Sequence, residues 1–264
     1  MSFRVLFFDS GVGGLSVFRD VMQNTTFDIS PIYLFDNDYC PYGNKDKEFI
    51  RERVVFLLKK AHEKFNLDLI VIACNTASTV ALESVRKVLD IPIVGVVPAI
   101  KPAAQMSKNK IIGLLATPMT ISMEYTKILI EKYAQNVKVE CIGSTILVKL
   151  AEQKISGVSY NKDLVKQELM PWINLDKKPD VIVLGCTHFP HLRDDISILF
   201  PNSQIIDSGK AIARRVEFLL STMQSIKEKS EPKAFCTNKL KITEELERSF
   251  SGFGFCEIID LLKF

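Results

Sequence analysis

Short, unbroken runs of aliphatic residues recur along this chain and constrain its fold more than any other feature. Most are continuous stretches of valine, isoleucine and leucine, which is typical of strands buried on both faces of a parallel sheet. We therefore predict eight strands, at residues 4–8, 32–35, 68–73, 93–97, 111–115, 137–142, 180–184 and 204–206.

Segments with helical periodicity separate these runs. One carries an apolar stripe at the spacing of a helix, made of Ile50, Val54, Leu57, Leu58, Ala61 and Phe65. Strands that alternate with helices indicate βαβ units, so the expected fold class is α/β with mainly parallel sheets. The polar residues 223–232 are expected to form a loop, and the last thirty residues give the weakest pattern.

Two stretches of the chain resemble each other. Residues 68–76 have the sequence DLIVIACNT and residues 180–188 have DVIVLGCTH, so each apolar run ends at a cysteine beside polar side chains. The repeat predicts two similar α/β lobes that face each other across a substrate cleft. We assign residues 1–97 and 210–264 to the first lobe, and residues 98–209 to the second.

The composition argues against several classes of function. A net charge of +3 with dispersed Lys and Arg does not favour nucleic-acid binding, and no apolar run is long enough to span a membrane. The run Val5–Phe8 is too short for a signal-peptide core, so we expect a cytoplasmic protein. Six cysteines, three histidines and no C-x-x-C pair favour free thiols and no metal site.

Four motifs follow predicted strands, at the edge where α/β sheets bind ligands. The motif DSGVGG at residues 9–14 opens a helix and is suited to hold an anionic group, although Asp9 alone is equally typical of a helix cap. Its spacing matches neither a dinucleotide fingerprint nor a P-loop. The other motifs are CPYGN at 40–44, which by itself indicates only a turn, ACNTA at 73–77 and GCTHFP at 185–190.

Cys74 and Cys186 stand apart from the other cysteines because each lies where a strand meets a helix, whose N-terminus lowers the pKa of a thiol. His188 lies two residues beyond Cys186. Two thiols on opposite faces of one carbon can racemise it, one as the thiolate base and one as the thiol acid. We interpret the remaining cysteines as inert small apolar residues: Cys40, Cys141, Cys236 and Cys256.

Together and in this order, the four motifs resemble the glutamate racemases, which belong to the cofactor-independent aspartate/glutamate racemases. The resemblance covers about residues 3–220 and extends to IDSG at 206–209 and to Thr117, Thr120, Ser122 and Tyr125. It implies two α/β lobes with glutamate between them, no cofactor, a homodimer, and the supply of D-glutamate for peptidoglycan.

The resemblance also implies residue roles. Cys74 matches the base that takes the α-proton from D-glutamate, and Cys186 matches the base that takes it from L-glutamate. Asp9 and His188 match polar groups that assist the thiols and contact the substrate. Glu152 matches an acidic residue near the site, whereas Tyr39 and Cys40 replace a stretch where the family often has arginine. Further substrate-binding positions are Ser10, Tyr42, Gly43, Asn75, Thr76 and Thr187.

Three alternatives remain open at this point. A related enzyme of the same two-lobe, two-cysteine class, such as an aspartate racemase or a maleate isomerase-like protein, is one alternative. The motifs ACNTA and GCTHFP favour glutamate over it, and a substrate panel would decide. A thiol-based redox or metal-binding protein would show thiol exchange or a bound metal. A non-catalytic binding protein, for example an inhibitor of a DNA-handling enzyme, would lack racemisation of L-glutamate in cofactor-free buffer.

Overall fold

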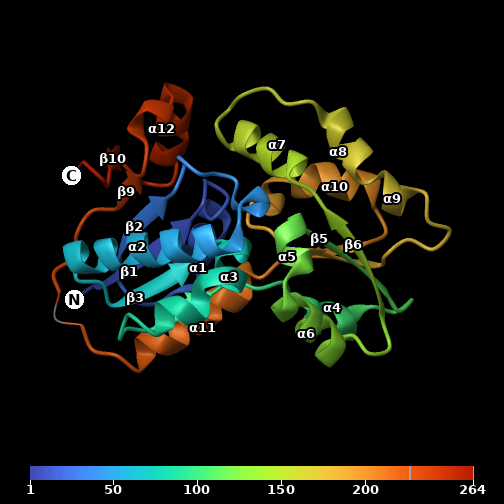
Figure 1. Cartoon of the computed structure of the whole chain (residues 1–264), viewed down its shortest axis with the longest axis horizontal. Coiled ribbons are helices and arrows are strands. Elements are labelled where there is room, and N and C mark those ends of the chain that lie inside the picture. Colours follow the sequence, from blue (N-terminus) through green and yellow to red (C-terminus); the bar gives the residue numbers. More distant parts are fainter. Residues whose placement is uncertain (226, 264) are drawn as a thin grey trace.

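The chain folds around two separate parallel sheets, which stand side by side in Figure 1. A computed structural model describes residues 1–225 and 227–263. The six-stranded sheet has the order β10-β9-β2-β1-β3-β4, and the four-stranded sheet has the order β6-β5-β7-β8. The strands are β1 (Phe3–Asp9), β2 (Ile29–Phe35), β3 (Leu69–Ile72), β4 (Ile93–Gly95), β5 (Ile111–Ala116), β6 (Lys138–Gly143), β7 (Val181–Leu184), β8 (Gln204–Ile206), β9 (Lys233–Cys236) and β10 (Ile258–Asp260).

Helices connect the strands and cover both faces of each sheet. Three 3₁₀ segments also occur among the described residues, η1 (Tyr42–Asn44), η2 (Phe189–Leu192) and η3 (Lys239–Lys241). The α-helices are α1 (Leu15–Asn24), α2 (Lys47–Phe65), α3 (Asn75–Arg86), α4 (Ile100–Met106), α5 (Pro118–Ser122), α6 (Glu124–Tyr133), α7 (Ile146–Ile155), α8 (Lys162–Glu168), α9 (Met170–Ile173), α10 (Arg193–Leu199), α11 (Gly209–Ser221) and α12 (Glu244–Ser251).

The alternation of side chains along β1 explains the layering of the first sheet. Val5 and Phe7 point into one core, which α1 and α11 cover, whereas Leu6 and Phe8 point into a second core under α2 and α3. All four side chains are fully buried. The sheet therefore buries both faces, as the unbroken aliphatic runs predicted.

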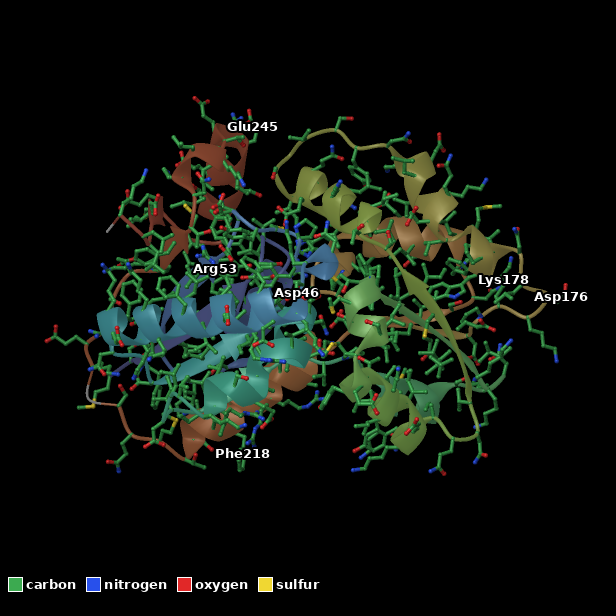
Figure 2. All side chains as sticks on the ribbon, in the orientation of Figure 1. Asp46, Arg53, Asp176, Lys178, Phe218 and Glu245 are labelled. Atoms are coloured by element: carbon green, nitrogen blue, oxygen red, sulfur yellow. The ribbon has the colours of Figure 1, made fainter. Side chains whose placement is uncertain are left out.

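Local signals place the longest helix. Asp46 precedes α2, and its carboxylate accepts hydrogen bonds from the backbone N–H groups of Glu48 and Phe49, which lack partners within the helix. Arg53 lies farther along the same helix (Figure 2), where its guanidinium pairs with the buried carboxylate of Asp36 after β2. A cap and an ion pair therefore fix α2 against the sheet.

The two sheets share one strand order. With β5 equivalent to β1, the order β6-β5-β7-β8 repeats the order β2-β1-β3-β4. In both, the strand that starts the unit lies between its second and third strands, so neighbouring connections diverge and leave a crevice at the carboxyl ends. Cys74 follows β3 and Cys186 follows β7, and the two cysteines therefore occupy equivalent positions.

The structure confirms the predicted α/β fold with two parallel sheets, and all eight predicted strands form within a few residues of their expected bounds. The described part of residues 223–232 is a loop. The predictions missed β9 and β10, which extend the first sheet beyond β2. Among the described residues, no helix combines the length and apolar character needed to cross a bilayer.

Candidate active site

The carboxyl end of β1 places a buried carboxylate beside Cys74. Asp9 is the last residue of β1, and its Oδ1 accepts hydrogen bonds from the backbone N–H of Ser10 at 2.5 Å and from Ser10 Oγ at 3.2 Å. Ser10 Oγ also lies 3.8 Å from Cys74 Sγ. One serine hydroxyl therefore connects the carboxylate to the thiol.

Cys74 caps α3 with its side chain, since Sγ accepts a hydrogen bond from the backbone N–H of Ala77 at 3.5 Å. Burial raises the pKa of the Cys74 thiol well above its ordinary value, and the Asp9 carboxylate raises it further, whereas the Ala77 N–H opposes this. The expectation that the helix N-terminus lowers this pKa is therefore wrong for the closed site, because loss of solvent outweighs the helix.

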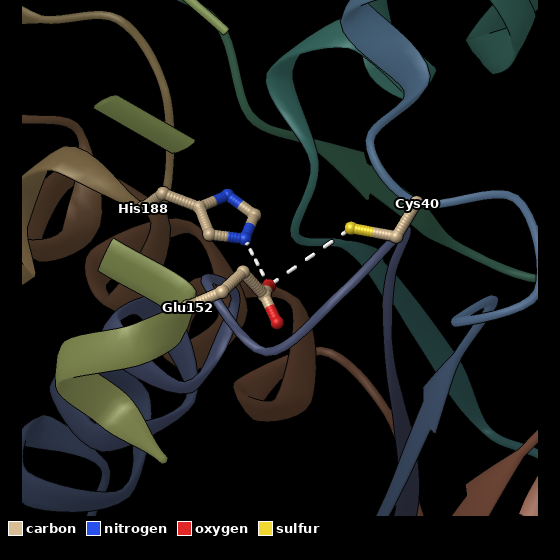
Figure 3. A group of neighbouring side chains, drawn as sticks. All are labelled: Cys40, Glu152 and His188. Atoms are coloured by element: carbon tan, nitrogen blue, oxygen red, sulfur yellow. Dashed lines mark hydrogen bonds and ion pairs between the residues drawn. The ribbon is translucent and has the colours of Figure 1, made fainter. Parts of the chain in front are cut away.

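The carboxyl end of β7 places a histidine beside Cys186. Cys186 Sγ lies 3.7 Å from Nδ1 of His188, and both residues are buried. Nε2 of the same imidazole lies 2.5 Å from Oε1 of Glu152 on α7 (Figure 3). The thiol, the imidazole and the carboxylate thus form a continuous chain.

Charge stabilises the pair between His188 and Glu152. Burial alone would lower the pKa of His188, but its hydrogen bonds with Cys186 and Glu152 outweigh burial and hold that pKa well above its ordinary value. Burial alone would raise the pKa of Glu152, but His188 outweighs burial and lowers it. Both directions favour an imidazolium beside a carboxylate.

A hydrogen bond between Thr187 and Asp9 joins the surroundings of the two thiols. Thr187, adjacent to Cys186, donates a hydrogen bond from Oγ1 to Oδ2 of Asp9 at 2.9 Å. Asp9 therefore contacts Ser10 with one oxygen and Thr187 with the other. Burial raises the pKa of the Asp9 carboxyl, while His188 and the hydroxyl of Thr187 oppose that effect. The structure thus brings all four predicted catalytic residues together: Asp9, Cys74, Cys186 and His188.

Three of the other predicted substrate-binding residues gather at the α3 side. Thr76 Oγ1 lies 3.0 Å from the hydroxyl oxygen of Thr117, and an added Cβ on Gly43 would touch the same threonine. Asn75 Nδ2 donates to the carbonyl of Val96 at 3.5 Å. A small, nearly closed pocket is lined by Asn75 together with Cys186 and Thr187.

The hydroxyl of Tyr42 binds Asp36 rather than a residue beside the thiols. Its hydroxyl donates to Oδ2 of Asp36 at 2.6 Å, and Asp36 also pairs with Arg53 and accepts from Thr237 Oγ1. The sequence analysis missed this buried network because its members are up to 201 residues apart. Within this network, Tyr42 holds the loop after β2. Its hydroxyl would have to leave Asp36 before it could contact a substrate.

The glycines after β1 let side chains from other segments pack closely against the backbone. A Cβ on Gly13 would lie 2.6 Å from Cγ of the His188 ring, so only glycine lets the imidazole pack there. The anionic groups that this backbone holds belong to the protein itself. Asp9 accepts from Ser10, and Glu152 accepts from the N–H of Val12 at 3.0 Å.

The remaining cysteines do not share one environment. Cys236 is buried, as suits a small apolar residue, whereas Cys141 and Cys256 are exposed and do not fill the core. Cys40 lies 3.9 Å from Oε1 of Glu152 (Figure 3), a contact that no local sequence pattern indicates. The interpretation of Cys40 as an apolar filler is therefore incomplete.

Comparison with known proteins decides which family shares this arrangement. The model of the family described as Asp/Glu/Hydantoin racemase matches residues 14–216. The chain belongs to this racemase family. The glutamate racemase of Photorhabdus laumondii is 45% identical over 260 residues, which is 98% of this chain and 90% of that protein. The glutamate racemase of Proteus mirabilis is 47% identical over 254 residues, or 95% of this chain and 88% of that one.

A solved structure of another racemase supports the same family. Escherichia coli glutamate racemase, crystallised with L-glutamate and the activator UDP-MurNAc-Ala, superposes with a TM-score of 0.92 at 42% identity, covering 98% of both chains. The similarity extends over both sheets, so the family's two-lobed α/β fold is the fold of this chain. Family membership makes this chain an isomerase rather than a redox or purely binding protein.

Proposed function

We propose that this chain is a glutamate racemase that interconverts L-glutamate and D-glutamate without a cofactor. The observation that carries the proposal is the pairing of Cys74 and Cys186 at equivalent strand ends, linked through Ser10, Asp9 and Thr187. The similarity to curated glutamate racemases over nearly the whole chain supports glutamate rather than aspartate as the substrate.

The reaction needs one base and one acid on opposite faces of the α-carbon. In the direction from D- to L-glutamate, the thiolate of Cys74 removes the α-proton, and the thiol of Cys186 then donates its proton to the other face. The roles reverse for L-glutamate, so each turnover leaves the two thiols with exchanged proton states. Burial and Asp9 hold the pKa of Cys74 well above the ordinary thiol value of ~8.5, so this thiol needs a neighbouring group to take its proton before it acts as a base.

Asp9 and His188 assist different thiols in this proposal. Asp9 reaches Cys74 through Ser10 and can receive the proton that Cys74 must lose before it acts as a base. His188 contacts Cys186 directly, and its imidazolium stabilises negative charge there and on the substrate. Glu152 positions that imidazole through Nε2.

Polar groups around the thiols are assigned to the substrate's carboxylates and amino group. Asn75 and Thr187 line the small pocket beside Cys186, and glutamate binding replaces their present contacts with Val96 and Asp9. The remaining substrate-binding assignments are Ser10, Tyr42, Gly43 and Thr76.

The proposal includes the setting of the enzyme. Residues 1–97 and 210–264 form one lobe, and residues 98–209 form the other, an assignment supported by the membership of β1–β4 and β9–β10 in one sheet. The enzyme acts in the cytoplasm as a homodimer and supplies D-glutamate for peptidoglycan synthesis. Nucleic acid and membranes take no part in catalysis.

One assay tests the activity directly. Purified, dialysed protein is given L-glutamate in cofactor-free buffer, and the decay of the circular-dichroism signal of L-glutamate is recorded. We expect full racemisation, and none with L-aspartate at the same concentration. Activity that disappears on dialysis and returns with added pyridoxal phosphate would refute the cofactor-free mechanism, and faster turnover of aspartate would refute the substrate.

A further inference from the structure

Cys40, Glu152 and His188 bring three kinds of metal ligand together beside the thiols (Figure 3). One thiol sulfur, one carboxylate oxygen and one imidazole nitrogen all lie within 4.8 Å of one another. The three residues come from distant parts of the chain, the loop after β2, helix α7 and the segment after β7. The fold, rather than a local sequence motif, creates the cluster.

All three ligand atoms pack closely against Gly11. A Cβ built on this glycine would lie 2.8 Å from Cys40 Sγ and 3.2 Å from His188 Nε2, and it would also contact Oε1 of Glu152. Metal–ligand bonds to sulfur, nitrogen and oxygen are about 2.0–2.3 Å long, so an ion bound between three atoms that lie within 4.8 Å of one another needs only small side-chain shifts. The glycine keeps the volume open.

A solvent pocket reaches the same cluster. Cys40 and Glu152 line a pocket of about 1000 Å³ between the loop after β2, α7 and α12, and Val12 lines it as well. The pocket gives an ion access and leaves room for water as a fourth ligand. Glu152 also accepts the N–H of Val12, a contact that orients the carboxylate beside the ion.

We propose that Cys40, Glu152 and His188 form a site for Zn²⁺, and that occupancy of this site inhibits the enzyme. A mixed sulfur, nitrogen and oxygen donor set suits Zn²⁺ and not Mg²⁺ or Ca²⁺, which take oxygen ligands. The inhibition, but not the binding, rests on the proposed racemase function. The site lies outside the pair of thiols assigned to proton transfer.

A bound ion removes the hydrogen bond with Glu152 that positions His188. The ion takes Nε2 of the imidazole and an oxygen of Glu152, and so replaces the hydrogen bond that holds these two groups together. Coordination releases the Cys40 thiol proton and the proton between His188 and Glu152 to water. His188 is then held by the metal at Nε2 and carries its one proton on Nδ1, beside Cys186. Giving this proton to Cys186 would leave an imidazolate, so His188 can no longer exchange a proton with the thiol.

The binding test uses Co²⁺ as a spectroscopic probe in place of Zn²⁺. Reduced, chelator-free protein is titrated with Co²⁺, and the near-ultraviolet charge-transfer absorbance of a thiolate–cobalt bond is recorded. We expect one equivalent of bound ion in the wild type and in Cys141→Ser, whose sulfur is exposed on β6 and is not part of the cluster. Cys40→Ser should lose this absorbance.

The activity test uses Zn²⁺ and the same variants. All three proteins should racemise glutamate at similar rates without metal. We expect Zn²⁺ to inhibit the wild type and Cys141→Ser reversibly, with recovery on adding EDTA, and Cys40→Ser to need at least tenfold more Zn²⁺. Mg²⁺ at the same concentrations should have no effect.

Two results would overturn the proposal. Unchanged cobalt absorbance and unchanged zinc inhibition in Cys40→Ser would place the ion on Cys74 and Cys186 instead. The absence of any stoichiometric Co²⁺ or Zn²⁺ binding by the wild type would refute the site whatever the activity of the enzyme. A chain that binds Co²⁺ through Cys40 but does not racemise glutamate would refute only the proposed function.

Discussion

Cys74 and Cys186 occupy equivalent strand ends but have opposite electrostatic surroundings. Ser10 and the carboxylate of Asp9 lie beside Cys74, whereas the imidazolium of His188 lies beside Cys186. The two parallel sheets thus repeat a scaffold without repeating its charges. The difference teaches that symmetric chemistry does not require a symmetric site, provided that each thiol has its own means to lose and regain a proton.

The largest expected effect comes from removing either thiol. Cys74→Ala and Cys186→Ala should each lower racemisation by about 10⁴-fold or more, because the base and the acid act as a unit. Cys141→Ala, at an exposed position, should keep activity and show at most a small loss of stability. Circular dichroism of L- and D-glutamate solutions measures both directions. Near-normal turnover in either Cys74→Ala or Cys186→Ala would contradict the two-base mechanism.

Replacing the neighbour of each thiol should expose the difference between them. Asp9→Asn should slow the step in which Cys74 removes the proton of D-glutamate, and His188→Asn the step in which Cys186 removes that of L-glutamate, each by about 10²-fold. The equilibrium constant is one, so kcat/KM must stay equal in both directions. The asymmetry should appear in separate kcat and KM values and in solvent-deuterium uptake. Identical changes for both variants would reject separate partners.

A smaller effect is expected one contact farther from the thiol. Glu152→Gln keeps the size of the side chain but removes the charge that holds the His188 proton. We expect about a tenfold loss of kcat with L-glutamate, little change in KM, and a pH–rate profile shifted to lower pH. A loss that appears only in KM, with an unchanged profile, would show that Glu152 has no influence on His188.

The smallest effect concerns stability. Folded His188 holds its proton more tightly than the unfolded chain does, so its stabilising contribution is complete below pH ~6.5 and declines as the pH rises toward the raised pKa. Between pH 6.5 and 8 this residue should lower the free energy of unfolding by up to about 1.4 kcal/mol per pH unit. Urea unfolding at several pH values measures the slope, which should be shallower in His188→Gln. Equal slopes in the two proteins would argue against a charged His188.

The sequence predicted the sheets and the thiols because both leave local signals. Runs such as Val181–Leu184 identify buried strands, and the residue after a parallel strand falls at the sheet edge where ligands bind. The strands β9 and β10 escaped because they are four and three residues long, and pair with a sheet that begins some two hundred residues earlier in the chain. Such pairing depends on tertiary contacts that no local pattern reveals.

Side-chain surroundings were harder to foresee. The position of Cys74 at a helix N-terminus suggested a lowered pKa, but burial and Asp9 reverse the direction. The contact between Cys40 and Glu152 spans 112 residues, and the sequence around neither residue indicates it. Family resemblance located residues, whereas the charges and distances between them required the fold.

The two connections between the sheets have a consequence for access to the buried thiols. The chain crosses once between β4 and α4 and returns between β8 and α11, and Ser208 Oγ donates to the carbonyl of Val97 at 2.5 Å, so the crossings lie side by side. Two adjacent tethers act as a single hinge line. A rotation about that line would break the hydrogen bond between Thr187 and Asp9 while leaving both sheets intact. If substrate enters and product leaves through that rotation, its rate sets a ceiling on turnover in either direction.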